Sequence, residues 1–227
     1  MTKAIIFDAS TLISFSMNGL IEEIKALKGI FKDGHFIITN EVKGEVIDRP
    51  IKIKRFELEA LKIKSMLDQG ILEMPSAIGV KDSEISTKTN EILELANKTF
   101  TGGDREIKIL HLGECSCLAL AGILNKQGIQ NAIAVDERTT RMLIEKPENL
   151  KKLFQKKFHT KIFSDPKNFK FFKGFNVIRS TELAYVAYKK GLVRLKNGIV
   201  LDALLYALKF KGCAISNEEI QEIEKLA

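Results

Sequence analysis

The sequence predicts an α/β fold with a mainly parallel central sheet, on three observations. Short apolar runs of strand length alternate with segments of helical periodicity along the chain. Three of these runs are followed by an acidic residue, at Asp8, Glu41 and Asp136. The 227 residues, 45% of them hydrophobic, suffice for one well-filled domain. Strands that alternate with helices favour parallel pairing through right-handed crossovers.

The elements of the first half follow from apolar periodicity and from residues that begin or end helices. Gly70 is suited to end a helix, and Asp82 or Ser83 is suited to cap the next one. In order, we expect a strand at 3–7, a helix at 12–28, a strand at 35–38, helices at 40–47 and 52–68, a short strand at 71–74 and a helix from 82 or 83 to 95. The run Thr101-Gly102-Gly103 is then expected to interrupt the regular structure.

The second half continues the alternation and then loses it. We expect helices at 104–112 and 114–124, a strand at 132–135, a helix at 137–145, a strand at 175–178, a helix from Ser180 or Thr181 to 190, a helix at 199–210 and a last helix opened by a Ser216/Glu219 capping box. The pattern weakens after Pro147. Without repeats or low-complexity tracts, one domain over 1–227 is predicted, with an insert at about 146–174 and a helical C-terminal extension at about 181–227.

Composition narrows the class of protein. No stretch approaches the roughly 20 apolar residues of a membrane helix, and Met1-Thr2-Lys3 leads straight into a strand without a signal-peptide layout. The expected location is therefore cytoplasmic, without a membrane partner. The odd number of cysteines suits reduced thiols. Cys115 and Cys117, with His111 nearby, are a possible soft-metal pair, but buried small hydrophobes are the favoured interpretation.

The net charge of +7 is concentrated in one segment. Residues 151–179 contain nine bases and one acid, so the rest of the chain carries a net charge of −1. This segment also mixes its lysines with seven phenylalanines between 151 and 175. Such a mixture binds nucleic acid when ammonium groups meet phosphates and rings stack on bases. The alternative is that most rings pack in the core while the lysines stay solvated, and this is favoured for most rings.

The acids at strand ends predict a metal site. Parallel strands end at one edge of a sheet, where ligands bind in open α/β folds. A further acid, Glu114, follows Gly113 and has no strand directly before it. Carboxylates without His or Cys favour Mg²⁺ or Mn²⁺, ions that promote phosphodiester hydrolysis. Each acid also fits a structural role: Asp8 and Asp136 as helix caps, Glu114 at a helix dipole, and Glu41 on an exposed helix face.

Four segments in this order resemble the motifs of the PIN-domain nucleases. Residues 5–13 resemble that family's opening strand, first acid and hydroxyl-bearing turn, and residues 39–42 resemble its second acid at a helix start. Residues 112–121 are similar to the Gly-Glu helix of a VapC-like subgroup, and residues 134–141 are similar to the fourth motif. The downstream piece 176–193 and the closing helices also resemble that subgroup. Only the insert departs from the pattern.

The resemblance implies a three-layer α/β/α sandwich with C-terminal helices packed on the core. It implies that Asp8, Glu41, Glu114 and Asp136 surround Mg²⁺ or Mn²⁺ and cleave RNA. Asp104, Glu45 and Glu137 are reserve acids. The candidate substrate-binding residues are Ser10, Thr11, Arg138, Lys156, Lys157, Lys170 and Lys173.

Several functions remain open. A metal-dependent endoribonuclease is the leading hypothesis, either a toxin neutralised by a small antitoxin protein or an RNA-processing enzyme, with a homodimer possible. The alternative is an RNA-binding module that keeps the fold without catalysis. A phosphatase with Asp8 as nucleophile is disfavoured, because the haloacid-dehalogenase pattern requires a second Asp where Ser10 stands.

Overall fold

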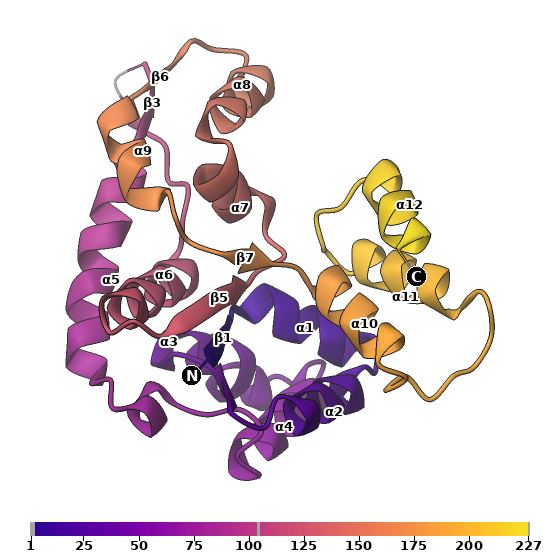
Figure 1. Cartoon of the computed structure of the whole chain (residues 1–227). Helices are drawn as coiled ribbons and strands as arrows, with labels where there is room; N and C mark the ends of the chain where they lie inside the picture. Colours follow the sequence, from indigo (N-terminus) through magenta and orange to yellow (C-terminus); the bar gives the residue numbers. More distant parts are fainter. Residues whose placement is uncertain (1–2, 104, 227) are drawn as a thin grey trace.

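The computed structural model describes residues 3–103 and 105–226 (Figure 1). The fold is α/β, with a four-stranded parallel sheet, a small antiparallel sheet and about 61% helix. The reserve acid Asp104 lies outside the described residues. Within the described ranges, no helix has the length and apolar character needed to cross a membrane.

The parallel sheet has the strand order β2-β1-β5-β7. Its strands are β1 (Lys3–Phe7), β2 (Gly34–Ile37), β5 (Gln130–Ala134) and β7 (Val177–Ile178). In the register, Ile5 lies beside Phe36 on one side and Ala132 on the other. Because all four strands run in one direction, their carboxyl ends share one edge, which leads to Asp8, Thr39, Asp136 and Ser180.

Helices connect the strands and cover the sheet. They are α1 (Ala9–Met17), α2 (Ile21–Ile30), α3 (Asn40–Lys43), α4 (Glu57–Asp68), α5 (Asp82–Asn97), α6 (Leu112–Lys126), α7 (Arg138–Glu145), α8 (Pro147–Phe158), α9 (Pro166–Phe172), α10 (Ser180–Lys189), α11 (Val200–Phe210) and α12 (Asn217–Lys225). A π-helical turn, Gly44–Asp48, follows α3, and short 3₁₀ turns form at Pro50–Lys52 and Pro75–Ile78. Helix α6, buried along most of its length, packs against β1, β5, α3 and α5. A helix made almost wholly of small and apolar residues is suited to such a central position.

The structure corrects several expected boundaries. The helix predicted at 12–28 is two helices, because Gly19 adopts a left-handed φ of 72° between them. The helix predicted at 104–112 is wrong. Arg105–Glu106 instead forms β4, and residues 107–111 are irregular. The strand predicted at 71–74 is reduced to one bridge between Glu73 and Ile37.

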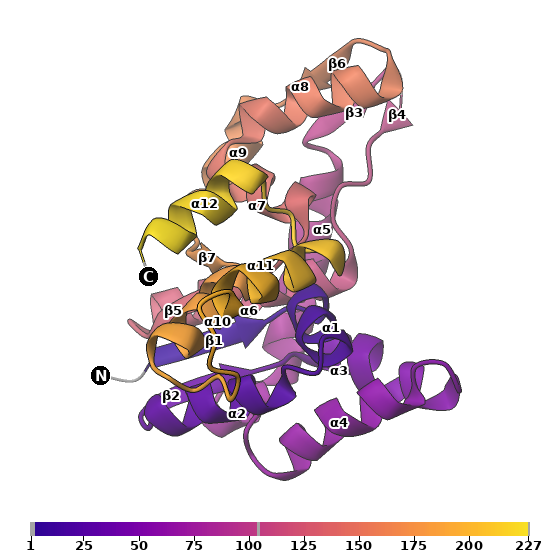
Figure 2. The ribbon, with the colours of Figure 1, turned by 90° about the vertical axis from the view of Figure 1, so that its right-hand side faces the viewer.

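The insert forms an arm that projects beyond the parallel sheet (Figures 1 and 2). We define the arm as residues 99–103, 105–108 and 146–174. It contains the antiparallel sheet β4-β3-β6, in which β3 (Phe100–Gly102) pairs with β4 (Arg105–Glu106) and β6 (Ile162–Ser164). The expected interruption at 101–103 is therefore largely strand, since both neighbours supply hydrogen-bond partners that the local sequence does not reveal.

The seven phenylalanines between residues 151 and 175 divide between core and surface. Phe154, Phe169 and Phe172 are buried, and Phe175 packs partly against the same core. Phe158, Phe163 and Phe171 keep 45%, 51% and 43% of their surface exposed. The prediction that most rings pack in the core is confirmed for four of the seven, and the other three remain available to solvent.

The C-terminal helices lie beside the sheet, on the side opposite α5 in Figure 1. Helix α10 contacts α1 and α2, α11 packs on α10, and α12 packs on α11. The predicted capping box is confirmed. Ser216 Oγ accepts a hydrogen bond from Glu219 N at 3.1 Å, and Glu219 Oε2 accepts one from Ser216 N at 2.8 Å.

Candidate functional site

Asp8 lies at the carboxyl end of β1 and is 4% exposed. Its carboxylate oxygen Oδ2 accepts hydrogen bonds from Ser10 N at 3.0 Å and from Ser10 Oγ at 2.5 Å, so it caps α1. Ser10 Oγ also accepts a hydrogen bond from Asp136 N at 3.0 Å. The structural role foreseen for Asp8 is therefore present, and Ser10 joins the ends of β1 and β5.

Glu114 opens α6 and is half-buried. Its Oε2 accepts a hydrogen bond from His111 N at 2.8 Å, which satisfies a backbone donor at the helix start. One turn further along α6, Cys117 Sγ lies 3.8 Å from the carbonyl oxygen of Phe7. This packing of α6 against the end of β1 brings Glu114 toward Asp8.

Glu45, a reserve acid, lies against the first turn of α6. A Cβ atom at Gly113 would lie 3.0 Å and 3.1 Å from the two carboxylate oxygens of Glu45. Glu45 belongs to the π-helical turn after α3. Such turns are rare in proteins overall, but those that occur are often at functional sites. A hydrogen bond of 2.6 Å between Thr39 Oγ1 and Ser116 Oγ joins the start of α3 to α6.

Electrostatic coupling indicates that Asp8, Glu45 and Glu114 belong together, and we call them the carboxylate cluster. Burial, reinforced by the charge of Glu114, raises the pKa of Asp8 to about 6. Burial and then the charge of Asp8 raise the pKa of Glu45. Burial also raises the pKa of Glu114, and the neighbouring Glu137 adds to the increase. Acids that are buried close together behave in this way, and the charges of Arg49 and His111 offset only part of the increase at Glu45.

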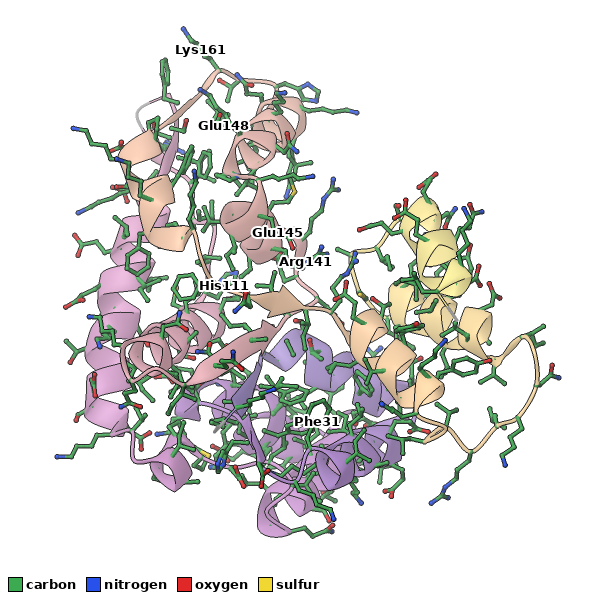
Figure 3. All side chains as sticks on the ribbon, in the orientation of Figure 1. Phe31, His111, Arg141, Glu145, Glu148 and Lys161 are labelled. Carbon is green, nitrogen blue, oxygen red and sulfur yellow. The ribbon has the colours of Figure 1, made fainter. Side chains whose placement is uncertain are left out.

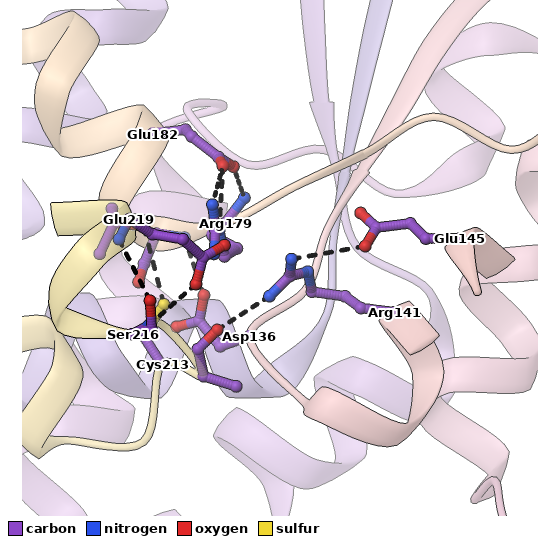
Figure 4. Close-up of polar contacts among 11 residues, drawn as sticks. Asp136, Arg141, Glu145, Arg179, Glu182, Cys213, Ser216 and Glu219 are labelled. Atoms are coloured by element: carbon purple, nitrogen blue, oxygen red, sulfur yellow. Dashed lines mark hydrogen bonds and ion pairs between the residues drawn. The ribbon is translucent and has the colours of Figure 1, made fainter. Parts of the chain in front are cut away.

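The other two predicted acids lie differently. Glu41 is half-buried in the first turn of α3, and its charge acts on Glu45 more weakly than that of Asp8. Asp136 is fully buried and faces α10, where its Oδ1 accepts a hydrogen bond from Ser180 N at 2.8 Å (Figure 4). Asp136 does not cap α7 as its structural role predicted. Glu137 caps that helix instead, and its carboxylate accepts a hydrogen bond from Thr140 N at 2.7 Å.

Asp136 stands beside an ion-pair network that holds the C-terminal helices (Figure 4). Arg179, next to Ser180, pairs with Glu182 at 2.7 Å and with Glu219 at 2.8 Å. The backbone N of Ala214 donates to the carbonyl oxygen of Asp136 at 3.2 Å. Within the described ranges, the second carboxylate oxygen of Asp136 is buried without a hydrogen-bond partner. The sequence around Ser180 did not predict that Asp136 would contact the start of α10.

The carboxylate oxygens of the cluster are suitable ligands for a hard cation, but their positions do not form a complete coordination set. All the clustered side chains offer carboxylate oxygens, the ligands that Mg²⁺ and Mn²⁺ prefer. The raised pKa values and the unpartnered oxygen of Asp136 mark places where positive charge would be stabilising. No three His, Cys, Asp or Glu side chains among residues 3–103 and 105–226 are placed to hold an ion. Ion binding would therefore require the carboxylates to approach one another.

The predicted substrate-binding residues fall into two groups. Arg138, Lys156, Lys157, Lys170 and Lys173 are all exposed, whereas Thr11 is fully buried and Ser10 is half-buried. Arg138 lines a pocket of about 570 Å³ between α7 and the C-terminal helices, together with Arg141 and Lys209. Arg141, labelled in Figure 3, donates to the carbonyl oxygen of Ala214 at 2.9 Å and lies 3.6 Å from Glu145. This pocket adjoins the segment that carries Asp136.

The cysteines are confirmed as buried residues with free thiols. Burial raises the pKa of Cys115 to about 12 and that of Cys213 to about 11, and it also raises the pKa of Cys117. Neutral thiols pack as small apolar groups, and a soft-metal site would require thiolates.

Replacing Gly113 by alanine is expected to displace Glu45 without unfolding the protein. The new methyl group would lie 3.0 Å from Glu45 Oε1, which is the movable end of a flexible side chain. We expect Mn²⁺ to raise the Tm of this variant less than that of the wild type. The circular dichroism spectrum should be unchanged, because the fold is intact. Gly122→Ala, in the same helix, meets only an ordinary contact at 4.0 Å and is the matched control. An equal Mn²⁺ response in both variants would contradict a metal-facing position for Glu45.

Comparison with known proteins gives no information on the function of this chain, which has to be inferred from the geometry of its site. No protein-family model, curated protein or solved structure matches it. Of the acids that the sequence singles out, Asp8 and Glu114 come together. The reserve acid Glu45 joins them, since the charge of Asp8 raises its pKa. Its spacing of four residues from Glu41 was the signal that the sequence offered, and its approach to Gly113 became visible only in the structure.

Proposed function

We propose that this protein is a metal-dependent endoribonuclease with a PIN-like α/β/α fold. The carboxylate cluster at the carboxyl edge of the sheet is the observation that carries the proposal. Asp8, Glu45 and Glu114 are drawn from three separate segments, yet the charge of Glu114 raises the pKa of Asp8 and the charge of Asp8 raises the pKa of Glu45. Burying acids together is costly, and a bound cation offsets that cost.

Each residue has a distinct part in the proposed reaction. When bound, Mg²⁺ or Mn²⁺ activates water for attack and neutralises charge that builds on the phosphate. Asp8, Glu45 and Glu114 would hold the ion, with Glu41, Asp136 and Glu137 as neighbouring acids. Ser10 orients Asp8 through its hydroxyl and ties it to the backbone of Asp136. The basic arm attracts the phosphate backbone of RNA.

A non-catalytic RNA-binding module is the second candidate, and two observations favour it. Asp8 and Glu114 already accept backbone hydrogen bonds as helix caps. In the part of the chain that the structure describes, no set of three ligating side chains is assembled.

Cleavage of a mixed RNA pool by the wild type and by Asp8→Asn tests the proposal. We expect the wild type to cleave with Mg²⁺ or Mn²⁺ and to stop in excess chelator, because the metal supplies the reactive water. Asp8→Asn should lose at least about 100-fold in rate, as is usual when a preorganised charge at a reacting centre is removed. Equal rates in both proteins would point to a contaminating nuclease. Binding without cleavage by the wild type would favour the module.

A further inference from the structure

Two exposed phenylalanines stand at the tip of the arm, one on each side of the turn that joins α8 to β6. Phe158 ends α8, and Phe163 lies on β6, with 45% and 51% of their surfaces exposed. Between them His159 adopts a left-handed φ of 50°, and Lys161 marks the tip in Figure 3. Figure 2 shows the turn between α8 and β6 at the end of the arm farthest from the parallel sheet. Both rings, exposed beside this turn, therefore lie near that end.

The arm does not need these two rings for its own core. Phe100, Phe154 and Phe169 form that core, with ring centroids 5.5 Å and 5.7 Å from Phe100. The ring centroid of Phe158 lies 5.8 Å from that of Phe154, while 45% of Phe158 stays exposed. Phe163 points out of its sheet, because its neighbour Ile162 is the buried residue of β6.

Each exposed ring carries a lysine. Lys157 Nζ lies 5.7 Å from the ring centroid of Phe158, and Lys161 Nζ lies 5.0 Å from that of Phe163. Residues 146–174 contain nine lysines and two acids, Glu148 and Asp165. Glu106, beside Thr101 on the sheet that also holds Phe163, is a nearby acid on β4. Positive charge nevertheless dominates the arm.

The arm is attached to the rest of the chain next to the candidate acids. The chain leaves β4 and reaches Glu114 eight residues after Glu106. On the other side, Glu137 immediately precedes α7, which leads into α8. Cys117 Sγ of α6 lies 3.8 Å from the carbonyl oxygen of Phe7, and the backbone N of Asp136 donates to Ser10 Oγ at 3.0 Å. Both attachment points therefore border the end of β1 that carries Asp8. A strand held by the arm would therefore be held beside the carboxylate cluster.

We propose that the tip of the arm binds single-stranded RNA by stacking bases on Phe158 and Phe163, with phosphates on the adjoining lysines. Aromatic rings bordered by cations bind single strands without sequence preference, since every base offers a π-face. The proposal specifies single strands as the substrate class. It rests on the proposed function only in taking RNA to be the nucleic acid that is bound. A duplex would engage the lysines and not the rings, because its bases are already stacked.

The test compares binding of a short unstructured RNA and of its duplex, in excess chelator so that no cleavage occurs. Phe158→Leu/Phe163→Leu should weaken single-strand binding about tenfold, leave duplex binding unchanged and preserve the salt dependence, because no phosphate contact is lost. Reversal of Lys156, Lys157, Lys170 and Lys173 to Glu should weaken both and flatten the salt dependence. Phe210→Leu, on α11 with 79% of Phe210 exposed, is the matched control.

The outcomes separate this proposal from the proposed function. Wild-type affinity in the double phenylalanine variant, with its fold intact by circular dichroism, would overturn the stacking role even if the wild type cleaves RNA. Loss of binding to anionic lipid vesicles with no loss for RNA would also overturn it, in favour of a membrane surface. Selective loss for single strands supports it even if no variant cleaves anything.

Discussion

Asp8→Asn is expected to stabilise the metal-free protein above about pH 7 by up to about 3 kcal/mol. Burial and Glu114 raise the pKa of Asp8 from 3.8 to about 6, and one unit corresponds to about 1.4 kcal/mol. Asp8 is almost fully buried, so solvent screens little of this effect. Asparagine keeps the shape and can still accept from Ser10 N, but it carries no charge.

The pH dependence of stability has a definite sign. The folded state holds the Asp8 proton more tightly than the unfolded state does. The contribution of this proton to the free energy of unfolding is therefore fully present below about pH 4 and is lost as pH rises through about 6. Glu114 on α6 and Glu45 on the π-helical turn face Asp8 and act in the same direction, since their pKa values are also raised. Urea denaturation across this range should show a smaller loss in Asp8→Asn than in the wild type.

The metal response should reverse this order of stability. Mn²⁺ should raise the Tm of the wild type, because an ion that binds only the folded state stabilises it by mass action. The Tm of Asp8→Asn should respond much less. Asp33→Asn, which changes an exposed acid in the turn before β2, controls for the loss of one charge. A wild type that is already the more stable protein without metal would count against a crowded acidic site.

Phe100→Ala is expected to cost about 3–5 kcal/mol, the usual range for removing a buried ring. Phe100 is fully buried and lies in contact with the rings of Phe154 and Phe169. Because these contacts belong to the arm, the loss should loosen it first.

Hydrogen exchange localises this effect. Amides of residues 146–174 should exchange faster in Phe100→Ala, while those of β1 and β5 keep their protection unless global stability limits them. Phe163→Ala removes an exposed ring from the same sheet and should cost under about 1 kcal/mol. Equal costs for both substitutions would mean that the arm has no core of its own.

Local sequence patterns predicted the parallel sheet well, because strand and helix periods are properties of short segments. The run before Asp8 forms a strand with the expected limits, and the Ser216 capping box forms as expected. The pattern failed where pairing is not local. Residues 105–106 pair with β3, which also pairs with β6 about sixty residues later, and no nearby residue specifies that contact.

The candidate site divides in the same way. The sequence by itself determined that acids follow buried strands, that Glu114 follows Gly113 and that basic charge is concentrated in the insert. Only the tertiary structure decided which acids meet. It brought Glu45 to Gly113, turned Asp136 toward Ser180, and left Phe158 and Phe163 exposed. The reason is physical: strand ends are set by neighbours in the chain, whereas side-chain proximity depends on how distant segments pack.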